Sequence, residues 1–216
     1  MVGSGIAAQR LSPHDTGLAL LENAVATGAA LVAIILAVGP VSGAHLNPVV
    51  SAVDALFGGL SRAELGVYAA AQVAGGVAGA VVANAMFSLP PVSLSVHHRD
   101  GGGQFLSEVV ATFGLLLVVF GIARARRFSA APFAVGAYIT AAYFYTSSTS
   151  FANPAVTVSR MFSNTFSGIA PASAPLFVVA QLCGAGLAAA AVGALWPHAT
   201  RQSAELVVVP HGAGAV

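Results

Sequence analysis

Apolar runs of membrane-spanning length alternate with short polar segments along the chain. A helix needs about 20 residues to cross the hydrocarbon core of a bilayer, and five runs approach that length. They cover residues 17–38, 65–87, 104–123, 132–148 and 174–196. We expect Gly39-Pro40 to end the first run. In the second run, Gly75 and Gly79 are four residues apart, a spacing that favours close contact between membrane helices. The pattern predicts an all-α membrane protein.

Two shorter apolar segments interrupt this series, and each follows a polar loop. They run from Asn47 to about residue 58 and from Asn153 to about residue 162, which is too short to cross a membrane. Each opens with an Asn-Pro pair. Asn is a good N-cap, and Pro fits the first helical position because its missing N–H is not needed there. We therefore predict two re-entrant half-helices.

The two halves of the chain repeat one order of elements. Each half reads as a span, a polar loop, an Asn-Pro pair, a short helix and a Gly/Ala-rich span, and within these last spans Gln72-Val-Ala-Gly-Gly matches Gln181-Leu-Cys-Gly-Ala. A full half has three crossings, an odd number, so the halves are inverted and the half-helices meet in mid-membrane. We expect one domain over 1–196, with repeats at about 1–88 and 104–196, and a loose tail at 197–216.

The first half is one span short. Residues 1–10 stand where the second half has 104–123. We expect 1–10 to be the outer end of a first helix whose beginning is missing. Either Met1 is not the true start or the chain is a natural truncation. About five full spans and the end of another are therefore predicted.

Composition narrows the class of protein further. The chain is 57% hydrophobic and only 7% charged, where a soluble domain carries about 25% charge, so an integral membrane protein in contact with lipid is expected. The net charge of +1 without a basic stripe argues against nucleic acid as a partner. The spans hold no cluster of His, Asp and Glu and no Ser-His pair, so we predict no enzyme activity, no metal site and no cofactor.

Arginine carries the whole topological signal, because the chain has no Lys. Positive residues favour the cytoplasmic side of a membrane. With the cluster at 124–127 inside, Arg62 and Arg201 fall on the same side, and Arg10 and Arg99 lie outside. A multi-pass protein of a bacterial inner membrane with a cytoplasmic C-terminus is predicted.

The Asn-Pro pairs also carry the candidate chemistry. If the backbone holds its side-chain oxygen, each Asn can point amide donors into a pore. The preceding segments, Gly43 to Leu46 and Thr149 to Ala152, would supply carbonyl acceptors. Two half-helices that meet at their positive dipole ends disfavour a cation but not a neutral hydroxyl compound. This arrangement predicts a passive channel for small neutral solutes.

These residues resemble the aquaporin, or major intrinsic protein, family. Ser42-Gly-Ala-His-Leu-Asn47-Pro48 is similar to the family's first box, and Phe151-Ala-Asn-Pro154-Ala155 to its second, whereas Val49 replaces the usual Ala. The resemblance implies six spans, two half-helices and a homotetramer with one pore per subunit.

The resemblance also implies a pore constriction. Counted from the boxes, its four members are Thr27, Ala141, Ser150 and Val156, and Val156 stands where the family usually has Arg. None of the four is aromatic or charged, so we expect a wide, weakly polar filter. This filter and the residues that follow the second box resemble those of bacterial aquaglyceroporins of arsenic-resistance operons. It implies passage of glycerol-like polyols, arsenite and methylated trivalent arsenicals as neutral hydroxides.

Other polar residues receive roles with their alternatives. Glu108 is expected to hold the second re-entrant loop, as a Glu does in the family. His45, after Gly43 and Ala44, either lines the inner vestibule or braces the loop. Arg160 either lies at the outer pore mouth or pairs with a carbonyl or a lipid head group. Tyr143 is expected to pack between helices.

Three other functions remain open at this point. The chain could be mainly a water channel, because the same boxes serve water pores. It could be a secondary transporter, since transporters also use inverted repeats, although Glu108 is the only good candidate for ion coupling. It could also be an inactive truncated product.

Overall fold

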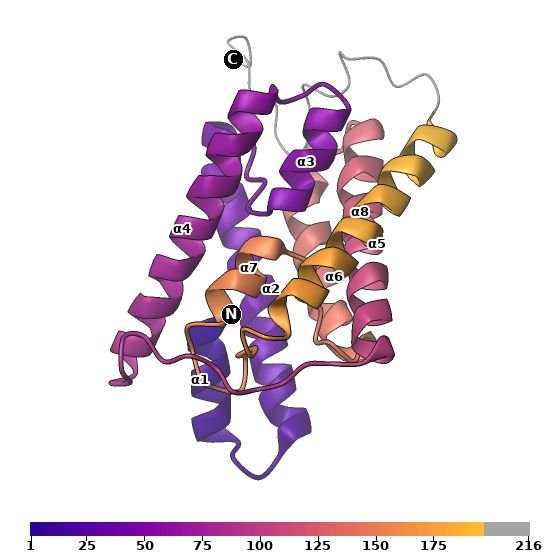
Figure 1. Ribbon diagram of the computed structural model, residues 1–216. Helices are drawn as coiled ribbons and strands as arrows, with labels where there is room; N and C mark the ends of the chain where they lie inside the picture. Colours follow the sequence, from indigo (N-terminus) through magenta and orange to yellow (C-terminus); the bar gives the residue numbers. More distant parts are fainter. Residues whose placement is uncertain (197–216) are drawn as a thin grey trace.

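Long helices form a bundle around two short ones that begin near its middle (Figure 1). The structure is a computed structural model and describes residues 1–196. Within that range the chain contains helices and no strand, which confirms the all-α prediction. The elements in chain order are α1 (Val2–Leu11), α2 (Thr16–Ser42), α3 (Pro48–Leu56), α4 (Arg62–Met86), α5 (Gly102–Arg124), the 3₁₀ turn η1 (Phe128–Ala130), α6 (Ala131–Tyr145), α7 (Pro154–Arg160) and α8 (Ala174–Leu195).

Four of the helices are long and apolar enough to cross a membrane, namely α2, α4, α5 and α8. The predicted span at 132–148 is shorter than expected, because α6 ends at Tyr145. The expected stop at Gly39-Pro40 is wrong, because Pro40 lies inside α2. A proline removes only one helical hydrogen bond, and α2 continues to Ser42. It ends at Gly43, whose φ of 69° is the left-handed turn that commonly closes a helix.

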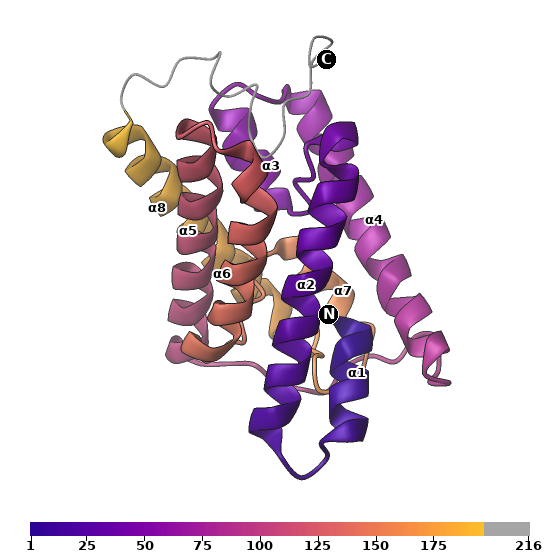
Figure 2. The same ribbon diagram turned by 180° about the vertical axis from the view of Figure 1, so that it is seen from behind.

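The half-helices α3 and α7 point to opposite ends of the bundle (Figure 1). The chain also reverses direction as an inverted repeat requires. In Figure 1, α2, α5 and α8 run upward along the chain, while α4 and α6 run downward. Figure 2 shows α2 beside α6, a contact that joins the two halves. The first residues form α1, which packs against α2 and α4.

Glycines allow close packing at the crossing of α2 and α6. A Cβ on Gly28 would collide with the Thr140 side chain, and one on Gly136 would lie 2.8 Å from the Gly28 carbonyl oxygen. The backbones of the two helices are therefore in direct contact. Gly75 and Gly79, expected at a helix contact, instead face open space within this chain. Their spacing alone did not show which helix face packs.

Most arginines of the described segments lie at one end of the bundle. Arg62 begins α4 and Arg124 ends α5, and both of these helix ends lie at the top of Figure 1. Arg99 belongs to the loop between α4 and α5 at the opposite end, which α1 also reaches. Arg201 and the predicted tail at 197–216 lie outside the described residues.

Candidate functional site

The two Asn-Pro segments meet and bind each other in the middle of the bundle. The Asn47 side-chain N–H donates to the carbonyl oxygen of Ala152 at 2.8 Å. The Asn153 side-chain N–H donates to the carbonyl oxygen of Leu46, also at 2.8 Å. Each donation reaches the residue just before the other asparagine. A primary amide carries two N–H donors, so one on each side chain is left for a solute.

Both asparagines also cap their half-helices. The Asn47 Oδ1 atom accepts the backbone N–H of Val49 at 3.1 Å. The Asn153 Oδ1 atom accepts the backbone N–H groups of Ala155 and Val156 at 2.9 and 3.3 Å. Each Pro follows as the first helical residue, as the sequence predicted. Because the oxygens are occupied, the amides can offer only donors to the space between them.

The loops before the asparagines share an unusual backbone. Ala44 and Leu46 have φ angles of 48° and 51°, and Ser150 and Ala152, at the matching positions, have 48° and 47°. The left-handed region costs a non-glycine residue roughly 1–2 kcal/mol. Four such residues persist only where the surroundings hold them. Their matching positions in the two halves reproduce the inverted repeat at the level of single residues.

Glu108 holds the second of these loops. This fully buried carboxylate on α5 accepts the Ser148 hydroxyl at 2.6 Å and the backbone N–H groups of Phe151 and Ala152, each at 2.9 Å. It also accepts the Gln181 amide of α8 at 2.6 Å. These four bonds occupy the carboxylate completely. They are the contacts that a loop support needs, and they leave no lone pair directed at a passing ion.

A cavity of about 50 Å³ lies at the meeting point of the loops. Its polar lining comes from Asn47, Asn153 and His45, and its walls are mainly apolar. Side chains four residues apart on three helices form these walls: Leu31 and Ile35 on α2, Leu115 and Val119 on α5, and Val135 and Ile139 on α6. A neutral solute loses its hydration water between these apolar walls. Only the asparagine amides can replace the hydrogen bonds that this water made.

The predicted constriction residues lie in different surroundings. Thr27 is buried on the cavity side of α2, and Ser150 is fully buried in the second loop. Ala141 is exposed, in a stripe with Phe133, Ala137 and Phe144 on the outer face of α6. Because a helix turns 100° per residue, Ala141 lies on the side of α6 opposite Ile139, which lines the cavity together with Val135.

Tyr143 takes the place expected for Ala141. It is buried four residues beyond Ile139, and its hydroxyl lies 3.4 Å from the Thr27 hydroxyl. Counting residues back from Asn153 missed it, because the count crosses the irregular loop between α6 and the second box. The spacing of apolar residues along α6 could have found it, since 135, 139 and 143 fall on one face.

Val156 lies half-buried at the start of α7. It lines a second hollow of about 520 Å³ between α4 and the first loop, and this hollow shares His45 and Leu46 with the central cavity. Gly43 and Ala44 are buried beside His45. The His45 Nδ1 atom lies 3.0 Å from the Ser51 hydroxyl. His45 therefore contacts the first half-helix through Ser51 and also lines the cavity.

Arg160 is buried inside the protein, with 1% of its surface exposed. Its guanidinium Nη2 donates to the Tyr143 hydroxyl at 2.8 Å, and its Cζ atom lies 4.1 Å from the centre of the Phe151 ring. The alternative of a lipid head group as its partner is excluded by this burial. The hydrogen bond found goes to a side chain and not to a carbonyl.

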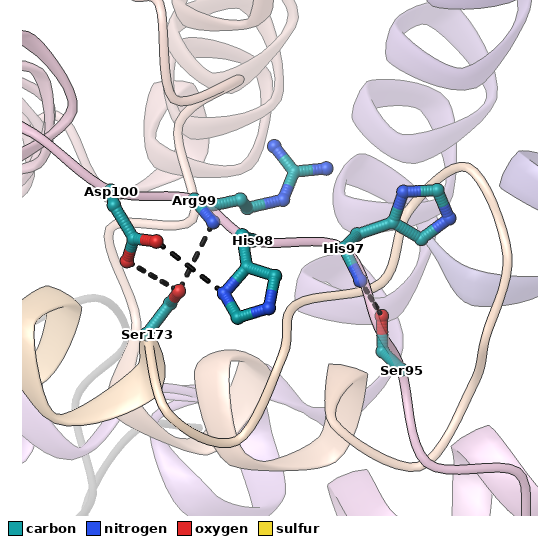
Figure 3. Close-up of polar contacts among 6 residues, drawn as sticks. All are labelled: Ser95, His97, His98, Arg99, Asp100 and Ser173. Carbon is teal, nitrogen blue, oxygen red and sulfur yellow. Dashed lines mark hydrogen bonds and ion pairs between the residues drawn. The ribbon is translucent and has the colours of Figure 1, made fainter.

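The loop between α4 and α5 covers the same end of the bundle as Arg160. Figure 3 shows Asp100 accepting the Ser173 hydroxyl at 2.6 Å, next to the ion pair between His98 and Asp100. Arg99 points away from this cluster and donates to the carbonyl oxygens of Gly168, Phe166 and Ser148. Burial first, and then the charge of Arg160, lowers the pKa of Arg99 to about 10. Arg99 therefore stays protonated at neutral pH.

Comparison with known proteins matches residues 1–152 to the family described as "Major intrinsic protein". The chain belongs to the major intrinsic protein family. It is 53% identical over 185 residues to aquaglyceroporin AqpS of Rhizobium meliloti (strain 1021), which covers 86% of this chain and 78% of that relative. It is 39% identical over 102 residues to aquaporin NIP1-4 of Oryza sativa subsp. japonica, with 46% of this chain and 37% of that relative covered.

Membership explains the main features of the site. Major intrinsic proteins are multi-pass membrane channels that pass small neutral solutes, and they are not enzymes. In this major intrinsic protein, the family match stops one residue before Asn153. The second half-helix and the arginine at its end thus lie beyond the matched region, where this chain also departs from the usual Arg after the second box.

Proposed function

We propose that the protein is a passive channel for small neutral hydroxyl compounds: glycerol-like polyols, arsenite, methylated trivalent arsenicals and water. The pair of asparagine amides, each with a spare donor in an apolar cavity, carries this proposal. The similarity to a relative named an aquaglyceroporin supports it.

The chemistry of these solutes fits the site. Trivalent arsenic in water is a small neutral trihydroxide, comparable to a polyol in the hydroxyl groups that it presents. Its oxygens can accept from Asn47 and Asn153, and the carbonyl groups of the two loops can accept its hydroxyl protons. At the asparagines themselves, a metal cation meets N–H donors and the positive ends of the two half-helices, which disfavour it.

A panel of fluxes in proteoliposomes tests the proposal. Purified protein is reconstituted, and the influx of water, glycerol, urea, arsenite and methylarsenite is measured against empty vesicles. We expect glycerol and the arsenicals to enter at rates that rise linearly with concentration and ignore a pH gradient. Saturation with proton coupling would favour a secondary transporter. Flux of water alone would favour a water channel, and no flux at all would mark an inactive product.

We also propose the bacterial inner membrane as the site of action, with a cytoplasmic C-terminus and a homotetrameric assembly. The concentration of arginines at one end of the bundle supports this orientation. The bacterial origin of the relative AqpS supports the membrane. The mass of the purified protein, measured by light scattering with the detergent subtracted, tests the tetramer.

A further inference from the structure

Two rows of cavity-lining side chains lead to Arg160. On α2, Thr27 lies one turn beyond Leu31, which lines the central cavity. On α6, Tyr143 lies one turn beyond Ile139, which lines it too. Residues four apart share a helix face, so both rows continue the cavity wall toward the end of the bundle that α7 faces. The two rows end at hydroxyl groups 3.4 Å apart, and the Arg160 guanidinium binds one of them.

The geometry of α7 brings Arg160 to this level. Side chains of a helix tilt toward its N-terminus, here toward Asn153 and the middle of the membrane. Arg160 comes one turn after Val156, and one turn rises about 5.4 Å, which an extended arginine side chain can reach back across. The guanidinium of Arg160 can therefore reach the membrane depth of Val156, the position at which the family usually has Arg.

Arg160 has donors to spare. Among the described residues its Nε atom is buried without a hydrogen-bond partner, and no carboxylate lies within ion-pair distance of its guanidinium. An unpaired buried donor costs about 1–3 kcal/mol unless water or a solute satisfies it. A purely structural arginine would be expected to use its donors on carbonyl groups, as Arg99 does on three of them.

The surroundings keep Arg160 in place and add to its field. The Phe151 ring lies within cation–π distance of both guanidinium groups, 4.1 Å from that of Arg160 and 5.1 Å from that of Arg99. Arg99 is charged at neutral pH, so two positive charges flank one ring at the outer end of the pore. In a low-dielectric site this combination strongly disfavours a third cation.

We propose that Arg160, oriented by Tyr143 and Phe151 and facing Thr27, is the residue that selects against cations and donates to solutes at the outer constriction. It replaces the charge that Val156 lacks. This assignment rests on the proposed channel function. With this assignment the expected filter is no longer wide and weakly polar. It is charged, and its charge comes from position 160 and not from position 156.

The test measures ions and solutes on the same vesicles. Arg160→Met keeps the length of the side chain and removes its charge and donors, while Arg160→Lys keeps a charge. We expect Arg160→Met to raise the K⁺ and proton flux by about tenfold or more, equivalent to a barrier lower by roughly 1.4 kcal/mol. Glycerol should still pass, and Arg160→Lys should keep most of the cation exclusion.

A second variant guards against a misfolded Arg160→Met. Tyr143→Phe keeps the ring and its packing but removes the hydroxyl that orients Arg160. We expect a smaller rise in cation flux and a changed ratio of glycerol to water flux. Ala137→Val, on the exposed face of α6, is the matched control and should leave every flux unchanged. A folded Arg160→Met, or a Tyr143→Phe, with the ion and solute fluxes of the wild type would overturn the assignment.

The same experiment separates this assignment from the proposed function. If the wild type passes glycerol and the variants match it in all fluxes, only the role of Arg160 fails. If the wild type passes no solute but Arg160→Met conducts cations, the solute proposal fails and Arg160 remains the barrier to ions.

Discussion

At the scale of single residues, a few buried polar groups fix the irregular backbone at the centre of the protein. Glu108 is the clearest case, because it accepts four hydrogen bonds and touches no cation within ion-pair distance. The resemblance to a family predicted a loop support at Glu108, and two of its bonds come from backbone N–H groups of the second loop. Local chemistry of this kind can be predicted because an isolated carboxylate in an apolar run must find donors nearby.

Replacing Glu108 by Gln should destabilise the protein. The new amide has one oxygen and two donors, and its donors would face the N–H groups of Phe151 or Ala152. We expect a loss of roughly 3 kcal/mol, typical of a buried network left with unpaired groups. Thermal unfolding in detergent, followed by intrinsic fluorescence, measures it. Glu64→Gln, an exposed residue in the first turn of α4 whose new amide oxygen can still accept the Ser61 backbone N–H, is the control and should change the unfolding temperature little.

Val156→Arg should reduce the flux of larger solutes more than that of water. The added side chain projects into the hollow beside the first loop and places a second cation one turn from Arg160. We expect glycerol and arsenite flux to fall by about tenfold, the effect of a barrier higher by roughly 1.4 kcal/mol. Stopped-flow swelling and arsenic uptake measure both quantities. Equal loss for every solute, water included, would mean that position 156 does not set selectivity.

At the scale of elements, the helices were predicted better than their facing surfaces. Apolar length predicted the spans, and Asn-Pro pairs predicted the two half-helices. The face that each helix turns inward was harder to predict, because it depends on register. On α6, a count from Asn153 selected the exposed Ala141, whereas the packed helix presents Tyr143. On α4, the pair Gly75 and Gly79 has the right spacing, but a Cβ at either position would meet nothing within 4 Å among the described residues.

The crossing of α2 and α6 should tolerate no added atoms at its glycines. Gly136→Ala places a methyl group 2.8 Å from the Gly28 carbonyl oxygen and 2.6 Å from Val32. The two helices must separate, which typically costs about 1–3 kcal/mol. Gly186→Ala on α8 meets nothing within 4 Å and, by its higher helix propensity, should be neutral or stabilising. The unfolding temperatures of both variants and of the wild type are measured, and we expect only that of Gly136→Ala to fall. Equal temperatures would contradict the close crossing.

At the scale of the whole molecule, the inverted repeat was predicted from element order, and α3 and α7 point to opposite ends of the bundle as such a repeat requires. The sequence could not predict how the two halves lock together. Reciprocal bonds between Asn47 and Ala152 and between Asn153 and Leu46 depend on the meeting of two loops in space. Arg160 also escaped a firm assignment, because its partners come from α6 and the second loop.

The orientation in the membrane can be tested with single cysteines. The exposed native Cys183 is first replaced by Ala. A cysteine at Ser129, beside the arginine cluster, should react with a membrane-impermeant maleimide only in inside-out vesicles. A cysteine at His98, in the loop at the other end, should react only in intact spheroplasts. The reverse pattern would place the C-terminus outside and contradict the positive-inside assignment.

The mutual bonds of the asparagines also have a consequence for the order of assembly. The two bonds join residues 105 and 107 positions apart. At a synthesis rate of about 5–20 residues per second, the partner of Asn47 leaves the ribosome roughly 5–20 s after it. During that interval the Asn47 side chain lacks the Ala152 carbonyl to which it donates in the folded protein. The first half-helix therefore reaches its final place late in biogenesis, as a product of both halves of the chain.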